Sequence, residues 1–285
     1  NAKADKLILA TNSIVAVVLE NGVAIKGDIF LLANGSMAGN VLKQSEFDLN
    51  VQPVFPGIGV SLELKAPDTA FNNCIRTPNR GGACGIYTTP LFKGQQQVND
   101  HIIVGASNFI SPAPFFHARV GSVSNLLESA VQEINKNFFD AQLLRVNVGW
   151  RPTTQDTYPL LGKTSVKNLI IATGTKRNGF HLAPLISQIM TALMMNEHVD
   201  ERLNVFAPER ELIRELSRDD AIEIGVKNLI SQHYQHGYRP SNIRLERLIQ
   251  DRFRKELEEL HEKVGALEWG IPPELINMYK RGYAN

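Results

Sequence analysis

Residues 147–162 read Asn-Val-Gly-Trp-Arg-Pro-Thr-Thr-Gln-Asp-Thr-Tyr-Pro-Leu-Leu-Gly, and residues 170–184 read Ile-Ile-Ala-Thr-Gly-Thr-Lys-Arg-Asn-Gly-Phe-His-Leu-Ala-Pro. In the first stretch an Arg-Pro pair follows a Gly-aromatic step. The Arg151 guanidinium is thereby placed beside a rigid turn, where it can fork onto a carboxylate. The second stretch predicts a strand, a Gly-rich loop and then a helix, which is how backbone amides are offered to an anion. Both stretches therefore indicate an α/β fold with sites for anionic groups.

These two stretches resemble the flavin-dependent amino-acid oxidases of the glycine oxidase and D-amino-acid oxidase family, over roughly residues 7–205. The resemblance implies a mixed α/β fold, in which the second half of an FAD-binding doubly wound domain is combined with an antiparallel-sheet substrate domain. Family members open with a strand, a G-x-G-x-x-G loop and a helix that hold the FAD pyrophosphate. The printed sequence carries no such fingerprint. We therefore expect a companion chain or a missing N-terminal segment to supply the nucleotide-binding half.

The chain divides into four expected segments. These are the C-terminal part of the FAD-binding domain (1–48), a β-rich substrate domain (49–148), a return to the FAD-binding domain (149–207) and an α-helical C-terminal extension (208–285). The extension lies outside the resemblance. Its apolar stripe at 241–264 must be covered either by the same chain or by another subunit. We favour another subunit and expect an oligomer.

Hydrophobic periodicity and turn residues predict the individual elements. Asn21-Gly22 marks a hairpin turn, and Pro184 is expected in the first turn of the third helix. Ser122 or Ser124 is expected to cap the second helix. The expected helices cover 38–44, 122–138 and 182–195, and the expected strands cover 7–9, 14–19, 28–33, 51–54, 59–64, 85–89, 101–105, 143–148 and 169–172.

Three residues are the candidate catalytic set. Arg151 would bind the substrate carboxylate in a bidentate manner and orient the α-carbon toward the flavin. The alternative is that Arg151 pairs with Asp156 or another structural acid. Asp156, Thr153 and Thr154 could form a turn that orients Arg151, and an ordinary Asx or ST turn is the other interpretation. Tyr87 falls where the family places an active-site tyrosine, although a half-buried sheet tyrosine is the other reading. Arg177 adds positive charge beside the Gly-rich loop.

The resemblance implies a non-covalent FAD site. A helix N-terminus with free amides stabilises the negative charge of a reduced flavin, and the Gly-rich loop would supply one. A plain strand-to-helix turn is the alternative. His181 replaces an aliphatic residue of the glycine oxidase pattern. Covalent flavin attachment would need a cysteine after the substrate strands, and none is found there. The expected cofactor-binding residues are Ala33, Asn34, Gly35, Gly149, Gly174, Thr175, Lys176, Arg177, Asn178, Gly179, Phe180 and His181.

The implied activity is hydride transfer from an amine or amino acid to flavin, giving an imine that hydrolyses to an oxo acid. The expected substrate is a small amine that carries a carboxylate, and the enzyme is an oxidase or a dehydrogenase. Two alternatives remain open. One is an FAD-dependent 2-hydroxy-acid dehydrogenase, which also binds a carboxylate. The other is a non-catalytic assembly subunit that kept the fold.

Composition sets the remaining bounds. The net charge of +1 gives no reason to expect a nucleic-acid partner. No apolar run approaches the ~20 residues needed to cross a membrane, and we expect a cytoplasmic protein. Cys74 and Cys84 are too few for a disulfide framework, although they could pair. His233 and His236 are expected to be a surface pair, and no metal site is expected.

Overall fold

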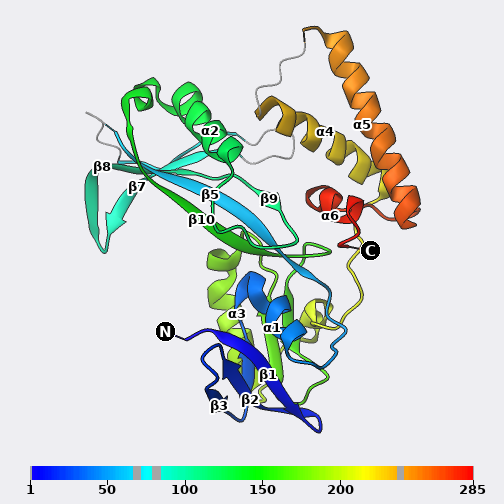
Figure 1. Cartoon of the computed structure of the whole chain (residues 1–285). Coiled ribbons are helices and arrows are strands. Elements are labelled where there is room, and N and C mark those ends of the chain that lie inside the picture. Colours follow the sequence, from blue (N-terminus) through cyan, green and yellow to red (C-terminus); the bar gives the residue numbers. More distant parts are fainter. Residues whose placement is uncertain (1, 67–71, 79–84, 236–240, 285) are drawn as a thin grey trace. The chain divides into compact units, whose positions relative to one another are not determined.

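The computed structural model describes residues 2–66, 72–78, 85–235 and 241–284. The chain splits into two compact units (Figure 1). The first comprises Asn1–Gly57 and Trp150–Ile213, and the second comprises Ile58–Gly149 and Arg214–Tyr283. Each unit is described by itself below. Cys74 is exposed and carries a free thiol, whereas Cys84, Gly81, Gly82 and His236 lie outside the described residues.

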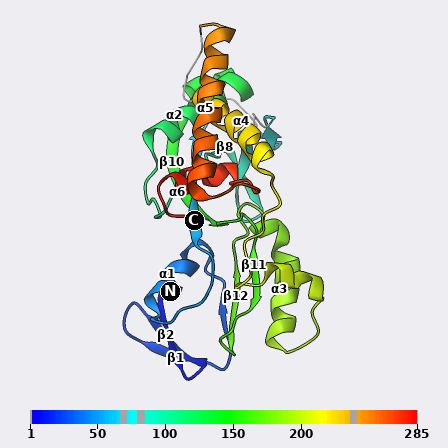
Figure 2. The same ribbon diagram turned by 90° about the vertical axis from the view of Figure 1, so that its right-hand side faces the viewer.

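A three-stranded sheet organises the first unit. Its order is β11 (Leu160–Lys163), β12 (Leu169–Thr173) and β4 (Phe30–Leu32), with β12 parallel to β4 and antiparallel to β11. Helix α3 (Gly179–Met194) packs on β11 and β12, as Figure 2 shows. Ile170 faces α3, while Leu169 and Ile171 face a core that includes Leu32 and Val41. Burial on both faces of β12 explains why this strand reads as a continuous apolar run.

The N-terminal part of the first unit is a small meander. Strands β1 (Ala4–Ala10), β2 (Ser13–Leu19) and β3 (Ala24–Lys26) pair antiparallel in that order. The expected turn is confirmed, because Gly22 has φ +81°, which its lack of a Cβ permits. A 3-10 turn, η1 (Gly35–Met37), precedes helix α1 (Ala38–Gln44), which occupies the residues expected from the sequence.

The second unit contains the antiparallel sheet apart from the ends of β5 and β10, and the strand order is β10-β5-β8-β7-β6, with β9 paired to β5. Its core is formed by alternate residues of β5 and β8 packed against α2, including Val60, Leu62, Ile102, Val104 and Leu126. The strands at 59–64 and 101–105 are confirmed, but residues 51–53 form no strand and only Val54 joins β5. The bounds are β5 (Val54–Lys65), β6 (Ile75–Arg76), β7 (Tyr87–Lys93), β8 (Gln96–Gly105), β9 (Phe109–Ile110) and β10 (Gln142–Thr154).

Two helix predictions need correction. The expected helix at 122–138 is broken into α2 (Val120–Ser129), a π-helical turn η2 (Ala130–Ile134) and a 3-10 turn η3 (Lys136–Asp140). The break falls at Asn135, which is extended and whose side chain accepts the Asn137 N–H, offering the backbone an alternative to the helix. Arg119, not Ser122 or Ser124, is the N-cap of α2. In addition, α3 begins at Gly179, so Pro184 lies inside the helix rather than in its first turn.

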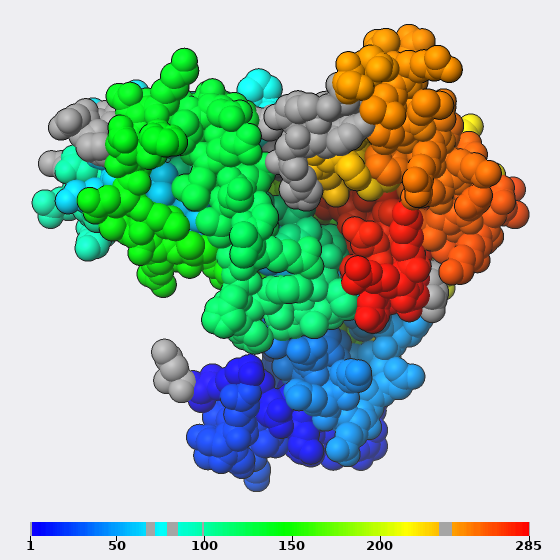
Figure 3. Space-filling view, turned by 45° about the horizontal axis from the view of Figure 1, so that its top comes forward, coloured from blue at the N-terminus to red at the C-terminus, as the bar shows by residue number. Residues whose placement is uncertain are grey.

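The extension is helical, as expected. It contains α4 (Arg218–Gln235), α5 (Ile243–Val264), η5 (Pro273–Leu275) and α6 (Ile276–Lys280), and the 3-10 turn η4 (Glu201–Phe206) precedes it. Asn242 caps α5, and Gly265 ends it in the left-handed conformation. Figure 3 shows α6 against α5. Leu257 and Leu260 of the apolar stripe are buried within the chain, whereas Ile243 and Leu248 are 67% and 57% exposed.

Candidate functional site

The carboxyl ends of two parallel strands meet in the first unit. Strand β4 ends at Leu32 and leads into Ala33, Asn34 and Gly35, while the neighbouring β12 ends at Thr173. The Thr173 Oγ1 hydroxyl donates a 2.8 Å hydrogen bond to the Gly35 carbonyl. Residues separated by about 140 positions in sequence are thereby joined at the carboxyl ends of two strands, which is where open α/β sheets bind ligands. Two groups of expected cofactor-binding residues therefore lie together.

The loop after β12 presents the start of α3. Gly174, Thr175, Lys176 and Arg177 lead to Asn178, which is the N-cap but whose side chain makes no capping hydrogen bond. The first amides of a 16-residue helix therefore remain available to an anion, and no acidic residue lies in its first turn. Asn178, Phe180 and His181 are exposed, Lys176 is half-buried and Arg177 is exposed. The donor set and charge of this loop fit the anionic edge of a reduced flavin.

Backbone geometry fixes this loop against the end of β10. Gly174 has φ +76°, and a Cβ at this position would lie 2.6 Å from Thr154 Cγ2 and 3.2 Å from Pro159 Cα. Lys176 also has a positive φ, of 55°, which is uncommon outside glycine. Its N–H donates a 2.8 Å hydrogen bond to the Pro152 carbonyl. The loop is therefore in direct contact with the residues that follow Arg151.

Arg151 lies near the end of β10, half-buried in the first unit. Gly57 of β5 allows β10 to approach closely, since a Cβ there would lie 3.3 Å from the Arg151 carbonyl oxygen and 3.1 Å from Thr153 Oγ1. The residue next to Arg151 is Pro152, the acceptor of the Lys176 amide. Arg151 and the flavin-facing loop expected from the sequence therefore occupy adjacent segments.

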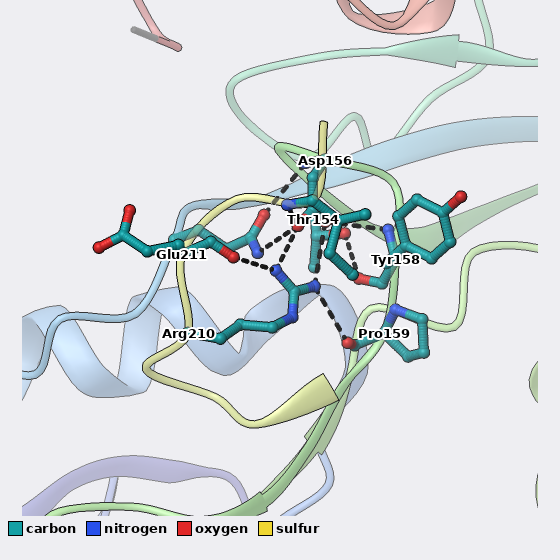
Figure 4. A network of polar contacts seen from close by, with 8 residues as sticks. Thr154, Asp156, Tyr158, Pro159, Arg210 and Glu211 are labelled. Carbon is teal, nitrogen blue, oxygen red and sulfur yellow. Dashed lines mark hydrogen bonds and ion pairs between the residues drawn. The ribbon is translucent and has the colours of Figure 1, made fainter. Parts of the chain in front are cut away.

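Asp156, the alternative partner considered for Arg151, is instead paired with Arg210 (Figure 4). Its side chain is 1% exposed and that of Arg210 is 8% exposed. The carboxylate also accepts from Gln52 Nε2 at 3.0 Å and from the Ile213 N–H at 3.0 Å. The Tyr158 N–H donates to Asp156 Oδ1 at 3.0 Å, so the expected Asx turn is confirmed.

The pKa of Asp156 follows from these contacts. Burial alone would raise the pKa of this carboxyl group. The hydrogen bonds from Arg210, the Ile213 backbone, Gln52 and the Tyr158 backbone outweigh that effect and lower the pKa below its usual range. Asp156 is therefore an anion at neutral pH, and its role is to organise the turn after β10.

Tyr87 and Gly149 belong to the second unit. Tyr87 begins β7 and is half-buried, opposite Gly105 in β8. Its ring lies across Gly105, because a Cβ at Gly105 would meet Tyr87 Cζ and Oη at 2.4 Å. Gly149 is exposed, and a Cβ there would meet nothing within 4 Å. Gly105 is thus required by the tyrosine, whereas no contact requires a glycine at position 149.

Sequence reasoning missed three residues of this region, namely Arg210, Gln52 and Thr173. Arg210 lies in a run of mixed charges, where a solvated side chain is the usual expectation. Arg202, eight positions earlier, is such a solvated side chain. It pairs with Asp200 on the surface, and its side chain is 90% exposed. No spacing distinguishes the two arginines. The glutamine and threonine act through tertiary contacts that carry no sequence signal.

Comparison with known proteins supports the class suggested by this geometry. The family of FAD dependent oxidoreductases (DAO) matches residues 2–193, and the chain belongs to this family. The bifunctional protein ThiO/ThiG of Nostoc sp. is 28% identical over 201 residues, which are 70% of this chain and 28% of that protein. Glycine oxidase of Pseudomonas aeruginosa is 26% identical over 182 residues, which are 64% of this chain and 45% of that protein.

Solved structures of the same fold are also similar. Glycine oxidase from Geobacillus kaustophilus has a TM-score of 0.60 at 21% identity, covering 74% of this chain and 53% of that chain. Iminodiacetate oxidase from Chelativorans sp. BNC1 has a TM-score of 0.56 at 19% identity, covering 71% and 52%. The mixed α/β fold of a flavin-dependent amino-acid oxidase is therefore confirmed. The chain spans about half the length of these structures and less than half of the curated relatives named above.

Two kinds of feature are absent from the described residues. None of the helices there is long and apolar enough to span a membrane. Within the same ranges, no cluster of three or more His, Cys, Asp or Glu side chains is placed to hold a metal ion. His233 is on α4, with its Nδ1 2.8 Å from the Leu229 carbonyl oxygen.

Proposed function

We propose that this chain forms the substrate-side part of an FAD-dependent oxidoreductase that oxidises a small amino acid or amine carrying a carboxylate. The hydrogen bond from Lys176 N to the Pro152 carbonyl carries the proposal. It joins the residue beside Arg151 to the loop that opens α3. A guanidinium suited to a carboxylate and a helix start suited to an anion therefore lie on adjacent segments of one unit. Family membership supports flavin chemistry at this place.

Each residue has a defined task in this proposal. Arg151 binds the substrate carboxylate through two parallel hydrogen bonds and so fixes the α-carbon. The first amides of α3 and the Lys176 ammonium oppose negative charge next to the substrate. FAD, when bound non-covalently, supplies the hydride acceptor. An amine that arrives neutral needs no strong side-chain base, so positioning and electrostatics are the contribution of the chain.

Substitution of Arg151 tests the proposed binding role. In an FAD-containing preparation, Arg151→Met should lower kcat/KM roughly tenfold to hundredfold, because hydrogen bonds between charged groups contribute ~1.5–3 kcal/mol. The flavin content should stay unchanged. Arg145→Met is the matched control, since Arg145 is an exposed residue of the same strand. An unchanged kcat/KM for Arg151→Met would show that this residue does not bind the substrate.

We also propose a companion polypeptide that carries the strand, G-x-G-x-x-G loop and helix. Within the described residues, β4 is the edge of its sheet and pairs only with β12. Ile29 and Leu31 beside this edge are 45% and 38% exposed. Phe180 and Leu185 of α3 are exposed as well, at 101% and 54%. A parallel strand with its following helix would pair with the edge and cover such apolar side chains.

The companion can be tested by joint expression and light scattering. The chain expressed with the first half of a family member should form a complex that contains FAD, whereas the chain alone should contain none. Leu31→Asp should weaken the complex, while Phe92→Asp, at an exposed site of the second unit, should not. The same measurement gives the oligomeric mass. Stoichiometric FAD in a preparation of residues 1–285 alone would contradict the proposal.

A substrate panel separates the alternatives. Turnover of amino acids with release of ammonia supports the proposed amine chemistry. Turnover of 2-hydroxy acids without ammonia would identify a hydroxy-acid dehydrogenase instead. An FAD-containing complex that oxidises neither class would support an assembly subunit that retains the fold. The relatives of this chain favour the first outcome, since they include a glycine oxidase and a D-amino acid dehydrogenase.

A further inference from the structure

A buried ion pair connects the segment after α3 to the turn after β10. Arg210 Nη1 donates to Asp156 Oδ2, and Nη2 donates to Oδ1 at 3.2 Å (Figure 4). The same guanidinium donates to the carbonyls of Glu211 and Pro159, at 3.1 Å and 3.4 Å. One side chain thus binds both the carboxylate in the turn and the backbone at the end of that turn. A planar fork suits this task, whereas a lysine ammonium does not reproduce it.

The turn that Arg210 holds has an unfavourable backbone conformation. Thr157 has φ 69°, which is an outlier for a β-branched residue. The Thr157 N–H donates to the Thr154 carbonyl at 3.1 Å, and Thr154 Oγ1 donates to the Tyr158 carbonyl at 2.5 Å. Asp156 accepts the Tyr158 N–H from the inside of the turn. Such a conformation persists only where the surrounding contacts determine it.

The loop of residues 174–179 packs directly against the turn of residues 154–159. Gly174 has no room for a side chain, because Thr154, Tyr158 and Pro159 surround it. Lys176, the second strained residue, is tied to Pro152 by its amide. Movement of the turn would therefore move both the loop before α3 and the strand end that carries Arg151.

Arg210 comes from outside the residues that match the family, which end at 193. We infer that Arg210 is a positioning residue. Through Asp156 it fixes the position of Arg151 relative to the loop of residues 174–179. The inference deepens the proposed function and rests on it for the meaning of Arg151 as a carboxylate ligand. The structural coupling between Arg210 and the loop stands on the contacts alone.

Hydrogen exchange of the whole chain measures that coupling without any activity. In Arg210→Met, the Lys176 amide should exchange ~10-fold faster or more, because loss of the buried pair permits local opening. Arg210→Lys should recover only part of the protection. Arg202→Met is the matched control, since it breaks an exposed Arg-Asp pair of the same unit and should leave the amide unchanged. Protection of Lys176 equal to wild type in both Arg210 variants would overturn the inference. Where Arg210→Met does not fold, Arg210→Lys carries the comparison.

A second measurement separates this inference from the proposed function. Acetate serves as the carboxylate probe, and its dissociation constant is measured with FAD-loaded protein. Arg210→Lys should raise that constant ~3-fold to 10-fold with kcat nearly unchanged, which is the pattern of lost ground-state positioning. If Arg151→Met leaves acetate binding unchanged while Arg210→Lys loosens the loop, the carboxylate role of Arg151 fails and the positioning device stands. If Arg151→Met abolishes acetate binding while Arg210→Lys alters neither binding nor exchange, the positioning role fails alone.

Discussion

Gly174→Ala is the substitution that most directly tests the packing of the candidate site. The new methyl group would lie 2.6 Å from Thr154 Cγ2, and 3.2 Å from both Pro159 Cα and the Tyr158 carbonyl oxygen. Two of these neighbours are backbone atoms, so they cannot move aside as a flexible side chain would. The φ of +76° adds a conformational cost. We expect about 1–2 kcal/mol from the left-handed backbone and about 1–3 kcal/mol from overpacking, hence ~2–5 kcal/mol in total.

The assay is urea unfolding followed by tryptophan fluorescence. The chain has two tryptophans, with Trp150 in the first unit and Trp269 in the second. In a Trp269→Phe background, the remaining fluorescence of Trp150 reports the unit that contains Gly174. A shift in midpoint without a change in slope then gives the loss of unfolding free energy.

Gly22→Ala provides the matched control for backbone strain. Gly22 lies in the same unit and has φ +81°, but a Cβ there would meet nothing within 4 Å. It should therefore lose only the ~1–2 kcal/mol of the backbone term. The difference between the two variants isolates the steric term. A Gly174→Ala protein no less stable than Gly22→Ala would refute the close packing of the loop against the turn.

Two further predictions concern the second unit. Gly105→Ala should destabilise this unit by about 1–3 kcal/mol, because the added methyl group would overlap the Tyr87 ring. The control Gly121→Ala in α2 places its methyl group in open space and should stabilise the unit by ~0.5–1 kcal/mol. Urea unfolding followed by Trp269 fluorescence in a Trp150→Phe background measures both variants, and equal stabilities would contradict the contact between Gly105 and Tyr87. Burial lowers the pKa of His261 from its ordinary 6.5, so the buried neutral ring contributes stability that is present above that pH and is lost as the pH falls below it. The free energy of unfolding should therefore be smaller at about pH 5.5 than at about pH 7.5, and a His261→Gln variant should show less of this loss. An identical pH dependence in both proteins would show that His261 does not cause it.

The sequence predicts local elements well where the hydrophobic pattern is uniform over the whole segment. Residues 29–33 and 169–172 are apolar throughout, and they contain β4 and most of β12. Their parallel pairing across about 140 residues leaves no local mark in the sequence, so it is seen only in the structure. Helix α1 was located to the residue, because its neighbouring turn residues delimit it. Periodicity failed at Asn135, where a side-chain hydrogen bond to the backbone interrupts an otherwise helical pattern.

The candidate site was predictable in its anion-binding parts and not in its supports. Arg151 and the Gly-rich loop carry their chemistry in residue type and order, so a motif can reveal them. Arg210 does not, because its importance comes from burial beside Asp156 rather than from its neighbours in sequence. The motif alone suggests a pair between Arg151 and Asp156, because the two residues lie close together in sequence. The structure assigns that carboxylate to an arginine 54 positions away, which leaves Asp156 in the turn and not as the counter-ion of Arg151.

Backbone strain also occurs at this place, as it does at other described turns such as those of Thr11 and Asn196. Thr157 and Lys176 both adopt positive φ without being glycine, and they lie on the two segments that touch through Gly174. Natural sequences violate local preferences mainly where function or a special contact requires it. A relaxed turn would be satisfied by glycine or asparagine at position 157, and no buried ion pair would be needed to hold it. The coincidence of two strained residues, one obligatory glycine and one buried Asp-Arg pair therefore argues that the position of this loop, rather than its mere presence, is what the fold maintains.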